Sequence, residues 1–254
     1  MASFHADGVT WSDERLWPQF AALAAADPDA TALIDCGDRH WSRGELHALA
    51  LDCVGRLEAA GVRAGSRVLV AGAKHAGTLA IALAVSACEA VFCPYSPKLA
   101  EAELGVLEDR LGHAARVVAD AAGGAEIVAA GQAARSADPR NRDAVLIGFT
   151  SGSTGVPKGV MHGAAALNYA TRTCAAIAGL GEGEPILGIV PLDSAPGFTF
   201  TAHFALSQGR ALVLVDPWDP VAAMRRATDH QAGWAIMVPT HLYTLEEAAR
   251  SCPW

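Results

Sequence analysis

The stretch AVLIGFTSGSTGVPKG, residues 144–159, decides the fold that we expect for this chain. Its first part, 144–149, is a continuous apolar run, which is typical of a strand buried on both faces of a parallel sheet. Its second part, 150–159, combines glycines and hydroxyl side chains with Lys158. Glycines let the backbone turn tightly and present N–H groups to an anion, while the hydroxyls add donors and the lysine adds a positive charge. The stretch therefore predicts a phosphate-binding loop at the carboxyl end of a buried strand, where open α/β sheets bind ligands.

The loop differs from two common phosphate-binding patterns. Aligning Gly152 with the first glycine of G-x-x-x-x-G-K-[ST] puts Pro157 where a glycine is required and Gly159 where the magnesium-binding hydroxyl belongs. The G-x-G-x-x-G spacing is missing as well. A flexible linker has a similar composition. The buried strand before the loop, the stiff Pro157 and the rarity of lysine favour a binding loop, because the chain has only Lys74, Lys98 and Lys158.

Helix and strand patterns alternate on both sides of this stretch, which predicts an α/β fold with largely parallel sheets. The expected strands are short apolar runs at 32–35, 39–41, 67–71, 91–94, 116–119, 186–190, 211–215 and 234–238. The expected helices are 12–26 with Ser12 as N-cap, 42–61, 75–88, 97–112, 163–179, 197–208, 220–230 and a last one from Pro239. No regular element is expected in 120–143, which is rich in alanine, glycine and charge.

Composition and charge limit the classes of function. The net charge of −8 disfavours a surface that binds nucleic acid or anionic membranes. The most hydrophobic stretch, 76–88, is too short to span a bilayer, and residues 1–11 lack the pattern of a secretory signal. We therefore expect a cytoplasmic protein with no nucleic-acid partner and no membrane span. Its 254 residues are enough to bury a substantial core.

Residues 150–160, TSGSTGVPKGV, resemble the signature phosphate loop of the adenylate-forming (AMP-binding) superfamily. This superfamily contains acyl-CoA synthetases, adenylation domains of peptide synthetases and luciferases. Further segments are similar to family blocks, namely 37–46, 61–70, 89–104, 190–197 and 237–245. The resemblance covers the chain from about residue 12 to 254.

The resemblance implies a reaction of a carboxylic acid with ATP to form an acyl-adenylate and pyrophosphate, followed by thioester formation with CoA. The implied partners are a small carboxylic acid, ATP carrying Mg²⁺, and CoA as co-substrate. The implied ligands of the ATP phosphates are Thr150, Ser151, Gly152, Ser153, Thr154, Gly155, Lys158 and Gly159. The implied acid pocket, where the family has "PLFHxxG", contains Pro191, Asp193, Ser194 and Gly197. No metal-ligating residue is identified.

The chain departs from the family pattern in two ways. Asp193 and Ser194 replace the aromatic–histidine pair of "PLFHxxG", and His203 is a weak substitute because a lone histidine in an apolar helix is more often a packed core residue. The later family blocks, including the catalytic lysine, have no counterpart, and no lysine follows Lys158. We therefore expect an incomplete N-terminal domain with stacked α/β lobes and no complete catalytic set, so that the chain alone turns over little.

The expected lobes are about 1–62 with 185–254, and about 65–180 with the loop at 150–159, the C-terminal domain being absent. A "WDP" stretch within 216–220 favours an acyl-CoA synthetase. Two alternatives stay open. They are a catalytically incompetent nucleotide-binding chain and an adenylation domain of the peptide-synthetase type.

Overall fold

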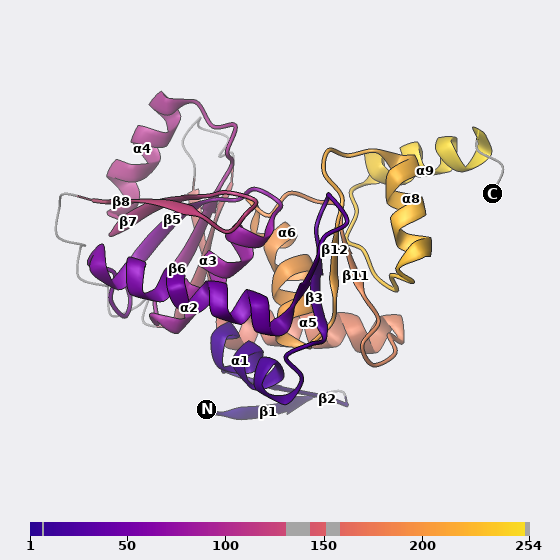
Figure 1. Ribbon diagram of the computed structural model, residues 1–254, viewed down its shortest axis with the longest axis horizontal. Helices are drawn as coiled ribbons and strands as arrows, with labels where there is room; N and C mark the ends of the chain where they lie inside the picture. The colour runs from indigo at the N-terminus through magenta and orange to yellow at the C-terminus, as the bar shows by residue number, and fades with distance from the viewer. Residues whose placement is uncertain (7, 131–142, 151–157, 252–254) are drawn as a thin grey trace.

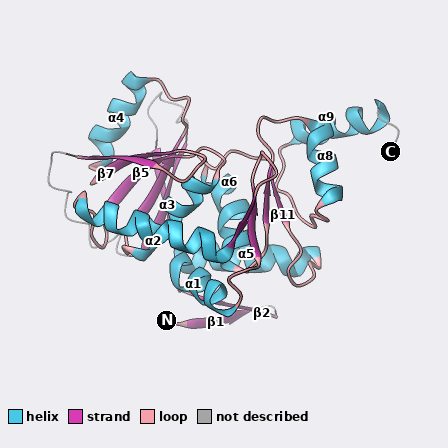
Figure 2. Cartoon of the chain, in the orientation of Figure 1, coloured by secondary structure: helices cyan, strands magenta, loops and turns pink. Residues whose placement is uncertain are grey.

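The computed structural model describes residues 1–6, 8–130, 143–150 and 158–251, and its strands form two main sheets (Figures 1 and 2). The six-stranded sheet has the order β10-β9-β6-β5-β7-β8. Its strands are β5 (Arg67–Ala71), β6 (Val91–Tyr95), β7 (Ala115–Ala119), β8 (Ala125–Ala129), β9 (Ala144–Thr150) and β10 (Lys158–Gly163). The four-stranded sheet has the order β11-β12-β3-β4. Its strands are β3 (Thr31–Ile34), β4 (His40–Ser42), β11 (Ile186–Gly188) and β12 (Leu212–Leu214).

Most strands inside the sheets pair in parallel, and the antiparallel pairs lie at edges. The parallel pairs are β5 with β6, β5 with β7, β6 with β9, β11 with β12 and β12 with β3. The antiparallel pairs are β9 with β10, β7 with β8 and β3 with β4. The prediction of an α/β fold with largely parallel sheets is confirmed. A separate antiparallel hairpin, β1 (Ser3–Ala6) and β2 (Val9–Ser12), precedes both sheets.

Helices cover both faces of each sheet. They are α1 (Leu16–Ala26), α2 (Arg43–Ala59), α3 (Ala76–Ala87), α4 (Glu101–Leu111), α5 (Ala164–Ala178), α6 (Ala195–Gly197), a π-helical turn η2 (Phe198–His203), α7 (Phe204–Ser207), α8 (Pro220–Asp229) and α9 (Pro239–Ser251). Figure 1 shows α1, α2, α3 and α5 between or beside the two sheets, α4 on the outer side of the larger sheet, and α8 and α9 on the outer side of the smaller one.

Alternation along the strands explains this layering. In β5, Val68 and Val70 belong to a large core that also contains α3, whereas Leu69 packs with Leu104 and Leu107 of α4. We call the large core, which includes Ala76 and residues 79–85 of α3, the central core.

The four-stranded sheet uses the same alternation. In β12, Leu212 and Leu214 face the central core, and Val213 faces a third cluster with Ala223 of α8. The two sheets thus share one helical layer, and the molecule is built in the sequence helix, sheet, helix, sheet, helix.

The start of the first helix differs from the sequence prediction. Ser12 does not cap it, because Ser12 pairs with Ser3 in the β1–β2 hairpin and α1 begins only at Leu16. The physical reason is Pro18, which lacks a backbone N–H and is tolerated only in the first turn of a helix. A helix that started directly after Ser12 would have put this proline in its interior.

Three further segments differ from the prediction. The apolar run 234–238 is not a strand, because Trp234 makes only a single bridge to Ile186 and the residues after it pack with the third cluster. Residues 125–129, for which no element was expected, form β8, an exposed edge strand; Ile127 and Val128 favour a strand, but the signal is short and stands among alanine, glycine and charged residues. The predicted helix 197–208 contains the π-helical turn η2.

The division into two lobes stays a prediction. The central core takes side chains from both proposed lobes, for example Leu46 of α2 and Leu79 of α3. Within the described part of the chain, none of the helices combines the length and the apolar character that crossing a bilayer requires.

Gly72, directly after β5, allows the two sheets to approach closely. A Cβ atom at this position would lie 2.5 Å from the Cα atom of Asp193, which follows β11. Because the obstructing atoms belong to the backbone, a methyl group at position 72 can fit only if the two chain segments move apart.

We expect Gly72→Ala to lower the free energy of unfolding by about 1–3 kcal/mol, the usual cost of overpacking. Gly55→Ala is the matched control, since a Cβ atom at Gly55 in α2 meets nothing within 4 Å and alanine favours the helix. Urea unfolding followed by circular dichroism measures both. Equal stability of the two variants would contradict the close approach.

Candidate functional site

The predicted phosphate loop connects two strands that pair with each other. β9 and β10 run antiparallel, with Thr150 opposite Lys158 and Gly148 opposite Val160. The two ends of the loop therefore lie side by side at the mouth of a hairpin. Of the predicted phosphate ligands, Thr150, Lys158 and Gly159 are described and are exposed. The others, Ser151, Gly152, Ser153, Thr154 and Gly155, lie outside the described residues.

One face of this hairpin carries the polar groups of interest. Because side chains alternate along a strand and directly opposite residues share a face, Lys158, Val160 and His162 lie on the same face as Gly148 and Thr150. Gly159 lies on the other face, where a Cβ atom would meet Ile147 at 3.0 Å. That arrangement places the cation of the loop and the Thr150 hydroxyl on one side of the hairpin.

The predicted acid-pocket residues form a tight turn between β11 and α6. The Ser194 hydroxyl caps α6 by accepting from the Gly197 N–H at 3.1 Å, and it donates to the Pro191 carbonyl at 3.3 Å. A Cβ atom at Gly197 would lie 1.9 Å from the Pro191 oxygen, so only glycine fits there. Asp193 presents its backbone to Gly72.

The hairpin face and this turn border one cavity of about 400 Å³. Its lining residues come from β9, β10, α5, the segment 194–196 and η2: Gly148, Phe149, Thr150, Val160, His162, Ala166, Leu167, Ala170, Ser194, Ala195, Pro196, Thr199 and Phe200. The cavity thus brings together Thr150 and Ser194 from the two predicted sets. Pro191, Asp193, Gly197 and Lys158 are not among its lining residues.

The lining favours an organic group over a bare ion. The volume falls in the range of small-molecule pockets, and apolar side chains surround a few polar groups. None of the lining residues is Asp, Glu, Lys or Arg. Among the described residues, no group of three or more His, Cys, Asp and Glu side chains gathers as a metal site would require.

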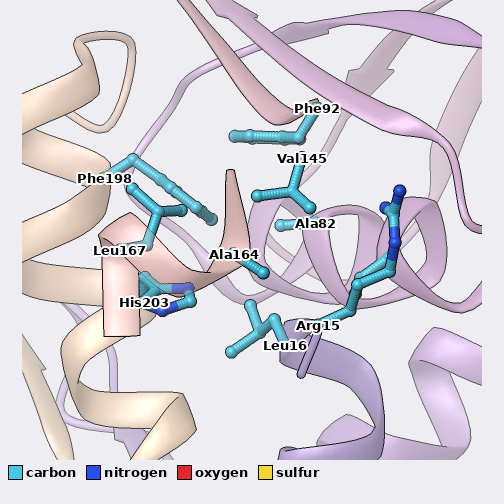
Figure 3. Close-up of a pocket in the computed structure, with 10 residues that line it drawn as sticks. Arg15, Leu16, Ala82, Phe92, Val145, Ala164, Leu167, Phe198 and His203 are labelled. Atoms are coloured by element: carbon cyan, nitrogen blue, oxygen red, sulfur yellow. The ribbon is translucent and has the colours of Figure 1, made fainter. Parts of the chain in front are cut away.

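His203 lies elsewhere. Its side chain borders a separate cavity of about 20 Å³, which it faces from the side opposite Arg15 (Figure 3). His203 Nε2 is 3.0 Å from Asn168 Oδ1, and Gln19 donates to the same oxygen at 3.2 Å. Burial, together with the nearby Arg172, lowers the pKa of His203 to about 4. The structure therefore places His203 in a buried polar network and away from the larger cavity.

Lys74 has a position that the sequence analysis did not single out. It follows β5 on the same loop as Gly72, and its ammonium group donates to the carbonyls of Ile189, at 3.0 Å, and Val215. The Asp216 carboxylate is 3.4 Å away. The Lys74 side chain is only 7% exposed. A signal was present in the sequence, because this lysine stands between an apolar strand and an apolar helix.

Comparisons with known proteins agree on one family. Residues 20–253 match the family model described as AMP-binding enzyme. Feruloyl-CoA synthase of Amycolatopsis sp is 30% identical over an alignment of 239 positions, which covers 88% of this chain and 48% of that protein. The chain thus spans about half the length of this relative.

Solved structures of two different kinds of enzyme have a similar fold. The o-succinylbenzoate CoA synthetase MenE of Bacillus subtilis, bound to a product analogue, superposes with a TM-score of 0.78 at 20% identity over 92% of this chain and 51% of MenE. The nonribosomal peptide synthetase FmoA3 gives a TM-score of 0.80 at 20% identity over 98% of this chain and 28% of FmoA3. These similarities show the fold and do not separate the two kinds of enzyme.

Because His203 is buried with a lowered pKa, we expect the free energy of unfolding to fall in acid. Between its ordinary pKa of 6.5 and its folded-state pKa of about 4, the unfolded chain binds a proton that the folded protein does not. The stabilisation is fully present above pH 6.5 and is lost as the pH falls toward 4, by on the order of 3 kcal/mol. We expect His203→Gln to flatten the pH dependence of urea unfolding in this window, whereas the same change at the exposed His40 leaves it unaltered. An equally steep dependence in the His203 variant would contradict this role.

Proposed function

The chain belongs to the AMP-binding enzyme family, and from that membership we propose that it binds ATP and a carboxylic acid for the formation of an acyl-adenylate, whose acyl group is then transferred to CoA. The observation that carries this proposal is the shared cavity: the strand that leads into the phosphate loop and the turn at 191–197 border the same space. An acid in that cavity has its carboxylate close to Thr150, where the loop begins.

The chemistry requires positive charge and donors near the phosphates. In the proposed reaction a carboxylate oxygen attacks the α-phosphorus of ATP, the new bond is a mixed acyl–phosphate anhydride, and pyrophosphate leaves with the electron pair of the broken P–O bond. Negative charge grows on the leaving group, and cations or N–H groups placed around it lower the barrier. We assign this role to Lys158, with Thr150, Gly159 and residues 151–155 as further phosphate contacts.

We propose that Mg²⁺ binds together with ATP. A small, hard cation bound mainly through phosphate oxygens and water needs few protein ligands. We therefore propose that Mg²⁺ arrives with ATP and neutralises part of the phosphate charge.

The proposed acid is compact. The lining of the 400 Å³ cavity is mostly apolar, with hydroxyls from Thr150, Ser194 and Thr199 and the ring of His162 as its polar groups. Such a lining suits a short- or medium-chain, alicyclic or aromatic acid. We assign Ser194 to the cavity wall, and Pro191, Asp193 and Gly197 to the turn that presents it.

CoA is the acceptor that we favour. Its support is the "WDP" stretch within 216–220 and the similarity to a CoA synthase over 88% of the chain. The fold of FmoA3 covers 98% of the chain, so an adenylation domain of the peptide-synthetase type is the second candidate. A preference for amino acids in the exchange assay would favour the peptide-synthetase adenylation domain over the acyl-CoA synthetase.

The proposal predicts carboxylate-dependent exchange of labelled pyrophosphate into ATP. The full gene product, whatever its length, is tested with aliphatic, alicyclic and aromatic acids and with amino acids. Lys158→Ala should lower the exchange rate by about 100-fold, as the loss of one transition-state contact does. The matched control is Lys98→Ala, another exposed lysine, which should leave the rate unchanged.

Two results would overturn parts of this proposal. If none of the acids in the panel supports pyrophosphate exchange, the proposed adenylation function is wrong. Nucleotide binding, measured by calorimetry, is then the remaining alternative. An unchanged rate in the Lys158 variant, with exchange in the parent protein, shows that the loop does not hold the phosphates.

A further inference from the structure

The cavity of about 400 Å³ has walls that belong to different sheets. One wall is the face of β9 and β10 with Gly148, Thr150 and Val160, which are part of the six-stranded sheet. Another wall is 194–196 with η2, which continues from β11 of the four-stranded sheet. The width of the cavity therefore depends on how the two sheets are held together at their carboxyl ends.

Lys74 connects the two sheets at the carboxyl ends of their strands. It is carried by the loop after β5, in the six-stranded sheet, yet its ammonium group donates to carbonyls that follow β11 and β12 in the other sheet. Ile189, one of the two acceptors, precedes the turn at 191–197. On the same loop, Gly72 touches the backbone of Asp193. Both contacts hold the turn that carries Ser194.

The buried partners give this link its strength. Ile189 and Val215 are 2% and 3% exposed, so their carbonyls have little access to water and depend on the ammonium donor. The side chain of Asp216 is 55% exposed, and an ion pair with such a partner contributes little. An ammonium group has three N–H donors, which match the two carbonyls and the carboxylate.

We propose that Lys74 is a positioning residue, which sets the spacing between the two walls of the cavity by holding the carboxyl ends of β11 and β12 against the loop after β5. The consequence for acid binding rests on the proposed function, whereas the bridge between the sheets does not. Among the described residues, Lys74 bonds to carbonyls outside the cavity lining and makes no hydrogen bond or ion pair with Thr150, Lys158 or Gly159, so it acts through the main chain that it holds.

Hydrogen exchange of the protein without ligands tests the bridge. In Lys74→Met, peptides covering 186–200 and 212–216 should exchange at least about tenfold faster, because their segment opens locally. Peptides of β5, β6 and β9 should keep their rates. Lys98→Met is the matched control, the same change at an exposed lysine, and should exchange like the parent protein.

Kinetics of pyrophosphate exchange test the effect on the cavity. We expect the KM for the acid to rise about tenfold in Lys74→Met, since the loss of a donor to buried carbonyls displaces one wall. The KM for ATP should stay within about twofold, because Lys74 makes no hydrogen bond or ion pair with the described residues of β9 and β10. Asp216→Asn removes only the exposed partner and should change neither constant.

Either of two outcomes overturns the proposal: exchange of 186–200 at the control rate, or faster exchange spread evenly over all peptides, which is global destabilisation. If the KM for the acid and the KM for ATP rise by the same factor, the proposed effect of Lys74 on the cavity is wrong. If Lys74→Met does not fold, Lys74→Gln, whose shorter side chain keeps two N–H donors but no charge, should show the same pattern with a smaller increase in exchange. If the parent protein exchanges no pyrophosphate with any acid, the proposed function is lost, and the hydrogen-exchange pattern alone decides whether Lys74 bridges the sheets.

Discussion

The burial of α3 on every side is the constraint on which the rest of the structure depends. Residues 76–85 are all buried, and all of them except Gly77 and Thr78 take part in the central core between the two sheets. A helix that is apolar all round is stable only when other elements enclose it completely. Its alanines, with Gly77 and Thr78, let neighbouring layers come close, and Leu79, Ile81, Leu83 and Val85 fill the space between them. Both sheets therefore pack against the same helix, and this packing sets their relative position.

This constraint determines where the candidate site lies. The loop that leads into α3 must emerge where the carboxyl ends of the two sheets meet, and it carries Gly72 and Lys74 to that place. Gly72 removes the side chain that would keep the sheets apart, and Lys74 supplies donors to the carbonyls at the strand ends. The β9–β10 hairpin reaches the same region from the larger sheet. The result is a cavity with mostly apolar walls, bordered by the strand that leads into the predicted phosphate loop.

Local sequence patterns predicted much of the fold, because the signals involve neighbouring residues. The apolar run before Thr150 is a strand, and the capping box of α2 forms between Ser42 and Glu45 as its spacing indicates. The prediction was wrong where two interpretations of one pattern compete. Ser12 is a good cap in isolation, yet it ends a strand, and the run after Trp234 packs as a loop although its composition is that of a strand.

The candidate site was predictable in parts and not as a whole. Thr150 and Lys158 were found from the composition of the loop, and Ser194 from its resemblance to a family block. The apolar neighbours of His203 indicated a packed core residue, which it is, but its polar partner Asn168 could not be predicted because it is 35 residues away. Lys74 was one of only three lysines, but nothing near it in the sequence indicated its acceptors.

The sequence by itself determined the family and the largely parallel α/β architecture, and it predicts the place of the phosphate loop, since each rests on the order of residues within short segments. Only the tertiary structure decided that Thr150 and Ser194 border one cavity, and that Lys74 reaches Ile189 and Val215, which are 115 and 141 residues away. The physical reason is that such contacts are set by how whole layers pack on α3. A segment can specify its own conformation, but the partner it meets depends on every layer between them.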